Sequence, residues 1–231
     1  MKKLLDRIFI DGLTGMAQGL FATLIIGTII QQIGTYCGGN IGDLIFTLGK
    51  VAAGLTGAGI GAGVARKLDA GHLVIVSAAV VGMIGAFAGN VMSGDIVNGG
   101  SLVLSGPGEP LGAFVAAYIS IEIGILISGK TKLDIILTPL VCIGVGSVVG
   151  LLVGPPISGF MSWLGSLINW GTEQQPFVMG IVVSVLMGMI LTLPISSAAL
   201  GVILNLSGLA AGAATVGCCC NMIGFAVASF R

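Results

Sequence analysis

Glu122 is a carboxylate inside an otherwise apolar run, from Tyr118 to Ile125, with no basic residue within one helical turn. An ionised carboxylate within a membrane costs roughly 2.5 kcal/mol or more, so we expect Glu122 to face the interior of a helical bundle, protonated or bound to a partner. One interpretation is a binding group that borders a polar cavity. The other is a protonated side chain that hydrogen-bonds a Ser, Thr or Asn of a neighbouring helix.

Glu109 precedes Pro110 at the end of a polar, glycine-rich stretch, residues 95–110. The apolar core of this stretch, residues 101–104, is too short to cross a bilayer and is bracketed by helix-breaking residues, which is typical of a re-entrant loop that lines a cavity. Pro110 is expected to open the next helix, whose N-terminus favours an anion. Glu109 is therefore either a binding group in such a loop or a helix cap in an outside loop.

The other candidates are uncharged or weakly basic side chains at or near apolar segments. Asn90, Asn205 and Asn221 each offer a donor and an acceptor, which suit the hydroxyl groups of a solute and equally suit a neighbouring helix. His72, the single histidine, follows the charged stretch 66–71. It is either a ligand or a solvated residue at the membrane interface.

The motifs of soluble catalysis are missing from the sequence. It has no nucleophile–base set, no phosphate-binding loop and no metal-binding motif. The five cysteines, Cys37, Cys142 and the run 218–220, lack Cys-x-x-Cys spacing and are interpreted as small packing residues. We therefore expect no catalytic residue, metal or cofactor, and a role in passage, binding or sensing within the bilayer.

Membrane helices must position these side chains. Of the 231 residues, 55% are apolar and 8% are charged, against about 25% charged in soluble domains. Nine basic residues balance nine acidic ones and no basic run occurs, which argues against nucleic acid as a partner. The 40 glycines lie within apolar runs, where they let helices pack closely. The sequence predicts an all-α, polytopic integral membrane bundle surrounded by lipid.

Seven to eight transmembrane helices are expected at about 20 residues per crossing. Basic residues occur in alternate loops, which predicts a cytoplasmic N-terminus. Besides the re-entrant loop, interfacial amphipathic helices are expected over residues 4–9 and 160–170. The predicted spans are 14–34, 47–65, 73–93, 110–129, 135–154, 177–193 and 195–213, with an eighth that begins at Met222.

An internal repeat is one hypothesis for this single transmembrane domain, residues 1–231. Residues 111–118 resemble 223–230, although glycine- and alanine-rich sequences also match by chance. If the duplication is real, residues 1–130 and 131–231 are parallel halves, and the second is incomplete. Arg231 would then lie inside the eighth span, so we expect the native chain to continue or a partner to cover this end.

Residues 1–17, the run 55–61 and the loop through Glu109 resemble the EIIC-type membrane proteins of bacterial phosphotransferase systems, and among these the PfoR-type (perfringolysin O regulator-like), or toxin-regulator, branch. The resemblance extends over essentially the whole chain. Sugar EIIC proteins carry a Gly-Ile-Thr-Glu-Pro loop whose Glu contacts the sugar. Residues 106–110, Gly-Pro-Gly-Glu-Pro, match three of its five positions, which implies a binding role for Glu109.

The resemblance implies an EIIC-like permease of the bacterial cytoplasmic membrane that translocates a small polar solute, such as a sugar, by alternating access. The chain would be at most the membrane subunit of a phosphotransferase system, would recruit separate EIIA and EIIB proteins, and would form a homodimer. Two alternatives are a membrane sensor or regulator that keeps the transporter fold, and an ion-coupled carrier or channel in which Glu122 relays protons. The candidate solute contacts are Glu109, Glu122, Asn90, Asn205, Asn221 and His72.

Overall fold

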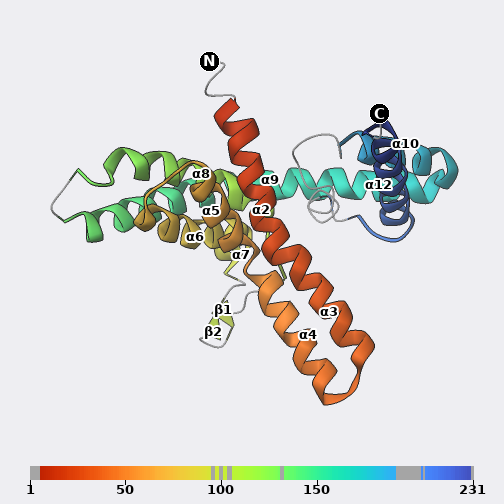
Figure 1. Cartoon of the computed structure of the whole chain (residues 1–231), viewed down its shortest axis with the longest axis horizontal. Coiled ribbons are helices and arrows are strands. Elements are labelled where there is room, and N and C mark those ends of the chain that lie inside the picture. The colour runs from red at the N-terminus through yellow and green to blue at the C-terminus, as the bar shows by residue number, and fades with distance from the viewer. Residues whose placement is uncertain are drawn as a thin grey trace. The chain divides into compact units, whose positions relative to one another are not determined.

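The computed structural model describes residues 6–94, 97–98, 101–102, 106–130, 133–190, 204 and 206–229. These residues belong to two compact units, Met1–Ser158 and Gly159–Arg231, which are described separately. Nearly all of the described chain is helical, which confirms the predicted all-α class (Figure 1). The proposed repeat halves and the single-domain organisation stay predictions.

The first unit begins with one long run of helical backbone that changes type along its length. It consists of the π-helical stretch η1 (Arg7–Gly12), α2 (Leu13–Leu20), the π-helical stretch η2 (Phe21–Ile25) and α3 (Ile26–Cys37). From Arg7 onward the chain is thus part of this run, whereas the sequence predicted a separate surface helix over 4–9. The physical reason is an ion pair of Arg7, described below, which removes the need for that charge to lie in the interface.

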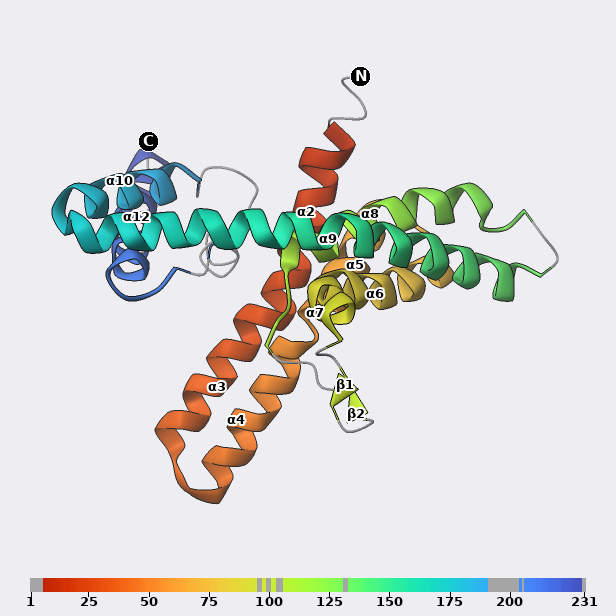
Figure 2. The same cartoon turned by 180° about the vertical axis from the view of Figure 1, so that it is seen from behind.

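The remaining elements of the first unit form a hairpin and a packed group of helices. Gly38, at a φ of 61°, ends α3 and reverses the chain into α4, so that the two helices run side by side (Figures 1 and 2). A short antiparallel pair, β1 with β2, lies beside α7 in both views. In chain order the elements are α4 (Gly39–Gly54), α5 (Thr56–Lys67), α6 (His72–Ala86), α7 (Ala88–Ser93), β1 (Val97–Asn98), β2 (Ser101–Leu102) and α8 (Pro110–Ile127).

Glycine contacts hold the helices of this unit at short distance. A Cβ added to Gly61 of α5 would lie 2.0 Å from the carbonyl oxygen of Ala78 in α6. A Cβ on Gly19 of α2 would lie 2.2 Å from the carbonyl oxygen of Gly59 in α5. Such backbone approach is the packing mode of membrane helices, where lipid provides no hydrophobic drive for association. The glycines therefore allow the helices of this unit to pack with their backbones in contact.

Four helices in the described residues are long and apolar enough to cross a membrane: Arg7–Cys37, Pro110–Ile127, Asp134–Ile157 and Gly208–Ala228. The pair α4 and α5, bent by 50°, would make a fifth span. Two shorter apolar helices are His72–Ala86 and Pro176–Met189. This confirms a multi-pass membrane protein. The total of seven to eight spans stays a prediction, because breaks at Leu55 and Phe87 shorten the uninterrupted helices.

Two boundaries differ from the sequence prediction. Helix α9 runs unbroken from Asp134 to Gln174 through three prolines, whereas the sequence predicted a span that ends near 154 and a separate interfacial helix. Prolines are tolerated in such helices where neighbouring groups satisfy the freed backbone. Helix α12 runs unbroken over Gly208–Ser229, so an eighth span that begins at Met222 is wrong. Small residues fill the expected gap and do not break the helix. About half of the predicted span 195–213 lies outside the described residues, and its last six residues belong to α12.

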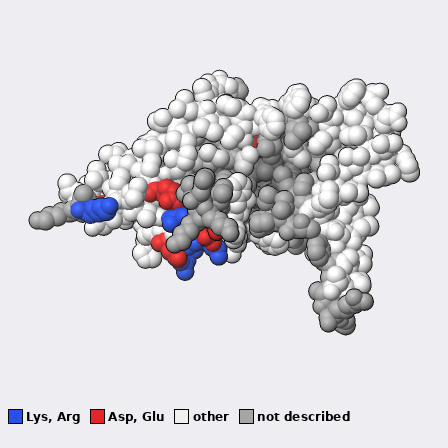
Figure 3. All heavy atoms as spheres, turned by 90° about the horizontal axis from the view of Figure 1, so that it is seen from above, with Lys and Arg blue, Asp and Glu red and all other residues white. Residues whose placement is uncertain are grey.

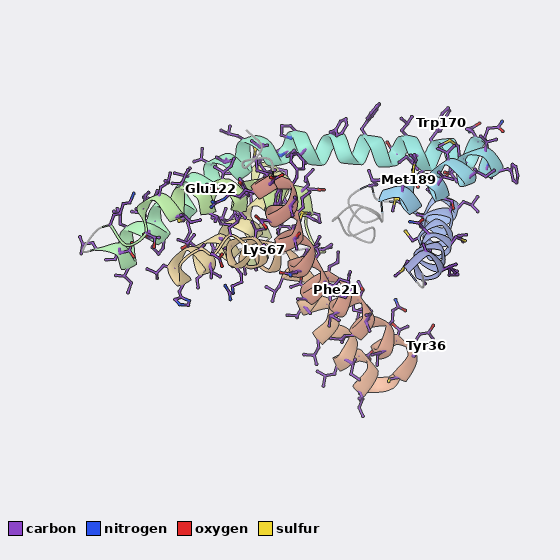
Figure 4. The ribbon with its side chains drawn as sticks, turned by 45° about the horizontal axis from the view of Figure 1, so that its top comes forward. Phe21, Tyr36, Lys67, Glu122, Trp170 and Met189 are labelled. Carbon is purple, nitrogen blue, oxygen red and sulfur yellow. The ribbon has the colours of Figure 1, made fainter. Side chains whose placement is uncertain are left out.

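The second unit is built from the end of α9, α10 (Pro176–Ile190) and α12. Val183, Met187 and Ala214 form its buried core. Gly217 of α12 approaches the backbone of Ser184 in α10, since an added Cβ would lie 2.0 Å from the Ser184 carbonyl oxygen. On α9, the side chains of Phe160, Trp163 and Trp170 stay exposed (Figure 4 labels Trp170), as expected of a face in contact with the membrane interface.

Candidate functional site

A cavity of about 180 Å³ lies in the first unit, where α6, α7, α9 and the segment before α8 meet. It brings together two of the predicted site residues, Glu109 and Asn90. Asn90 is an exposed residue of α7, and Glu109 directly precedes α8. The lining residues are Gly85, Ala86, Phe87, Gly89, Asn90, Gly108, Glu109 and Gly154.

A break between α6 and α7 shapes one wall of the cavity. Phe87, at φ −110° and ψ 19°, leaves the helical conformation. The carbonyl of Ala86 then accepts a hydrogen bond from the backbone N–H of Glu109, at 2.7 Å. Irregular backbone at membrane depth is tolerated only where protein or a polar cavity surrounds it. The broken helix is therefore consistent with a binding site for a polar solute.

Gly108 explains how the chain places Glu109 against the helix break. Its φ of 70° is in the left-handed region, and an added Cβ would lie 2.8 Å from both the Cβ and the carbonyl oxygen of Ala86. Only glycine fits this position without displacing α6. Gly108, one of the two residues that replace the Ile-Thr of the sugar EIIC loop, thus lies directly on Ala86.

Glu109 contributes a carboxylate to the cavity wall. Its Oε1 is buried and has no hydrogen-bond partner among the described residues. Burial raises the pKa of this carboxyl group above its ordinary value of 4.5, and the backbone N–H of Leu111 opposes part of the shift. Pro110 opens α8 as predicted. The expected re-entrant loop before it lies largely outside the described residues.

The raised pKa predicts that thermal stability falls as the pH rises. Between the ordinary pKa and the raised one, the folded state keeps a proton that the unfolded chain has released, so a higher pH favours unfolding. Tm in detergent, measured from about pH 4 to about pH 8, should therefore fall more steeply for the wild type than for Glu109→Gln. Glu173→Gln, which removes an exposed carboxylate, should keep the wild-type slope. Equal slopes for all three proteins would contradict the prediction.

Glu122 does have a basic partner. The Nε of Arg7 lies 2.8 Å from its Oε1, and the two atoms are buried. Glu122, labelled in Figure 4, lies in the second half of α8, five residues before its end, or roughly 8 Å at 1.5 Å per residue. Sequence reasoning missed the partner because it searched one helical turn. A basic residue at the start of another apolar run, Arg7, was the available signal.

The other predicted residues lie away from the cavity or outside the described chain. His72 is exposed at the first residue of α6, at the opposite end of that helix from Ala86. Asn221 donates a hydrogen bond to the carbonyl of Gly188, which joins α12 to α10 in the second unit. Asn205 lies outside the described residues. In the part of the chain that is described, no group of three His, Cys, Asp or Glu side chains could hold a metal.

Several lining residues were not predicted as functional. Phe87 and Gly154 carry no sequence signal of a site, and Gly85 and Gly89 are among the glycines that the sequence predicts only to let helices pack closely. Gly154 does pack, since an added Cβ would lie 2.6 Å from the Cβ of Ala88. Gly89 has open space around its Cβ position. It therefore borders the cavity without supporting a neighbouring helix.

The fold and the cavity define a multi-pass helical membrane protein with a polar chamber at a broken helix. Residues 10–231 match the family of EIIC components of the phosphotransferase system, and the chain belongs to this family. Neither a curated protein nor a solved structure matches the chain. Family membership makes the chain a membrane component of sugar transport that works with EIIA and EIIB proteins. The PfoR-type branch stays a prediction.

Proposed function

We propose that the chain is a permease that binds a small neutral sugar or polyol in the cavity beside Glu109 and Asn90 and moves it by alternating access. The observation that carries this proposal is the buried, unpartnered carboxylate oxygen of Glu109 on the cavity wall. A buried acceptor without a donor is costly, and a solute hydroxyl supplies the missing hydrogen bond.

The chemistry of the lining favours a neutral polyhydroxylated solute. Glu109 accepts hydrogen bonds from hydroxyl groups, Asn90 donates and accepts, and Phe87 offers an apolar wall. Among the described residues, no Lys or Arg lines the cavity, which disfavours an anionic substrate. Its volume of about 180 Å³ is smaller than the roughly 300–1,000 Å³ of pockets for drug-sized ligands. A phosphorylated product would be repelled by the Glu109 carboxylate, which would assist its release.

Uptake into proteoliposomes tests the proposal. The probes are radiolabelled hexoses, hexitols, N-acetylhexosamines and disaccharides. Loss of a hydrogen bond to a charged group costs about 1.5–3 kcal/mol, so Glu109→Gln should raise KM roughly 10- to 100-fold for the transported sugar. Glu173→Gln is the matched control and should leave KM unchanged. An unaltered KM in Glu109→Gln would remove the assignment, and sugar binding without flux would favour the sensor hypothesis.

The partners and the topology belong to the same proposal. Separate EIIA and EIIB proteins would supply the phosphoryl group at the cytoplasmic face of the bacterial membrane. Arg66 and Lys67 are exposed at the end of α5, where an acidic partner surface could dock. This end of α5 carries basic residues, as the positive-inside rule expects of a cytoplasmic end. The homodimer and the cytoplasmic N-terminus are further parts of this proposal, whereas contacts of Glu122, Asn205, Asn221 and His72 with solute stay predictions from the sequence and do not belong to the proposed cavity.

A further inference from the structure

One face of α8 carries a stripe of three large side chains spaced four residues apart. Phe114, Tyr118 and Glu122 follow one another along the helix, and the rings of Phe114 and Tyr118 are 5.9 Å apart. Residues spaced four apart lie on the same side of a helix. The stripe thus begins five residues after Glu109, which lines the cavity, and leads toward the other end of α8.

The π-helical stretch η1 covers this stripe. A Cβ added to Gly12 would lie 3.2 Å from the ring of Phe114, so the backbone of η1 rests on that ring. At its other end, η1 places the Nε of Arg7 2.8 Å from Oε1 of Glu122. The hydroxyl of Tyr118 is buried beside the same two charged groups. Gly12 thus covers the Phe114 end of the stripe, and Arg7 covers the Glu122 end.

Arg7 also lines a second cavity. This cavity has a volume of about 360 Å³ and is lined by charged side chains, which gather in one group on the surface in Figure 3. Arg7 therefore lines the charged cavity and also contacts the stripe, of which Phe114 is buried and Tyr118 and Glu122 are half-buried. Besides Arg7 and Leu68, the lining residues are Asp6, Asp11, Lys67 and Asp69.

The backbone of η1 is suited to movement that leaves the rest of the helix in place. π-Helical turns are rare, and they are frequently found at functional sites. Helix α2, which follows, is held to α5 by direct glycine contacts: an added Cβ on Gly15 would lie 2.7 Å from the carbonyl oxygen of Gly63. Among the described residues, no glycine backbone contact of this kind links η1 to α8. The two elements meet at the Phe114 ring and at the ion pair of Arg7 with Glu122.

We infer that η1 is a gate: it closes the Phe114–Tyr118–Glu122 stripe, and the ion pair of Arg7 with Glu122 is its latch. When the latch opens, the charged cavity and the stripe become one polar passage along α8. The inference rests on the proposed function in one respect: the passage would serve the transported sugar. The closed latch itself can be tested without any sugar.

Cysteine labelling in membranes tests the gate. All five native cysteines are replaced by alanine, and Tyr118→Cys introduces a thiol on the stripe. N-Ethylmaleimide requires hydrated thiolate, so the closed gate should make the reaction slow. Adding Glu122→Gln, which removes the charge and keeps the shape, should raise the labelling rate about tenfold, because the open state becomes more populated. Arg7→Gln should act in the same way.

Two controls decide between a gate and a general loosening of the structure. Ala117 is fully buried on α8 but lies off the stripe, so Ala117→Cys should label slowly with and without the latch. The charge reversal Arg7→Glu with Glu122→Arg should restore slow labelling of the thiol at position 118. An unchanged rate at 118, or equal increases at 117 and 118, would overturn the inference. These outcomes do not depend on whether any sugar is transported.

Discussion

Replacement of Gly89 by leucine is expected to reduce sugar uptake to background while the protein stays folded. Gly89 lines the cavity with Asn90 and Glu109, and a Cβ added to it meets no atom within 4 Å. The leucine side chain therefore has room to form and occupies the space that a solute needs. The measurement is the initial rate of sugar uptake into proteoliposomes, together with the elution profile of the purified protein.

Gly144→Leu is the matched control for this substitution. Gly144 is also helical and exposed, and a Cβ added to it likewise meets no atom within 4 Å, but it does not line the cavity. Both variants replace glycine by the same helix-favouring residue. Uptake should therefore be lost in the first and kept in the second. Normal uptake by Gly89→Leu would place the transported sugar somewhere else in the chain.

The sequence was sufficient to identify the two polar groups of the cavity but not the element that joins them. Glu109 and Asn90 were recognisable because a carboxylate before a proline and a carboxamide at the end of an apolar run are unusual in a membrane chain. The break at Phe87 has no such signal, since neither proline nor a polar residue occurs there. It is stabilised by a tertiary contact, the hydrogen bond from Glu109 to Ala86.

Long-range pairing also limited the prediction for Glu122. The cost of a carboxylate in the membrane correctly indicated that it needs a partner. The partner, Arg7, is far away in the sequence, and only the packing of the first helix on α5 brings it to α8. The ion pair gives Glu122 a role in holding two elements together, and a direct contact with solute stays a prediction.

Helix ends were the least predictable part of the fold, for related reasons. The three prolines of α9 suggested an end that the structure does not have, because a packed membrane helix can tolerate freed backbone groups. Gly38 and Pro110, in contrast, act locally. A left-handed glycine ends α3, and a proline at the first helical position opens α8. Helix ends that depend on the local backbone were therefore predictable. Helix ends that depend on contacts with neighbouring helices were not.

Gly61→Ala is expected to be strongly destabilising although it adds only one methyl group. The new Cβ would lie 2.0 Å from the carbonyl oxygen of Ala78 and 2.6 Å from its carbonyl carbon. These are backbone atoms of α6, so no side-chain rotation can relieve the clash and α5 must move away from α6. Overpacking in a dense core typically costs about 1–3 kcal/mol, and a rigid backbone contact favours the upper end of that range.

Thermal unfolding in detergent measures this effect. For a chain of this size about 1 kcal/mol corresponds to a few degrees, so Tm of Gly61→Ala should fall on the order of 5–10 °C. Gly144→Ala places the same methyl group in open space, and its Tm should equal or slightly exceed that of the wild type. Equal Tm values for the two variants would mean that α5 and α6 are not in direct backbone contact. In that case the position of α6, and with it the helix break that carries the cavity, would need to be revised.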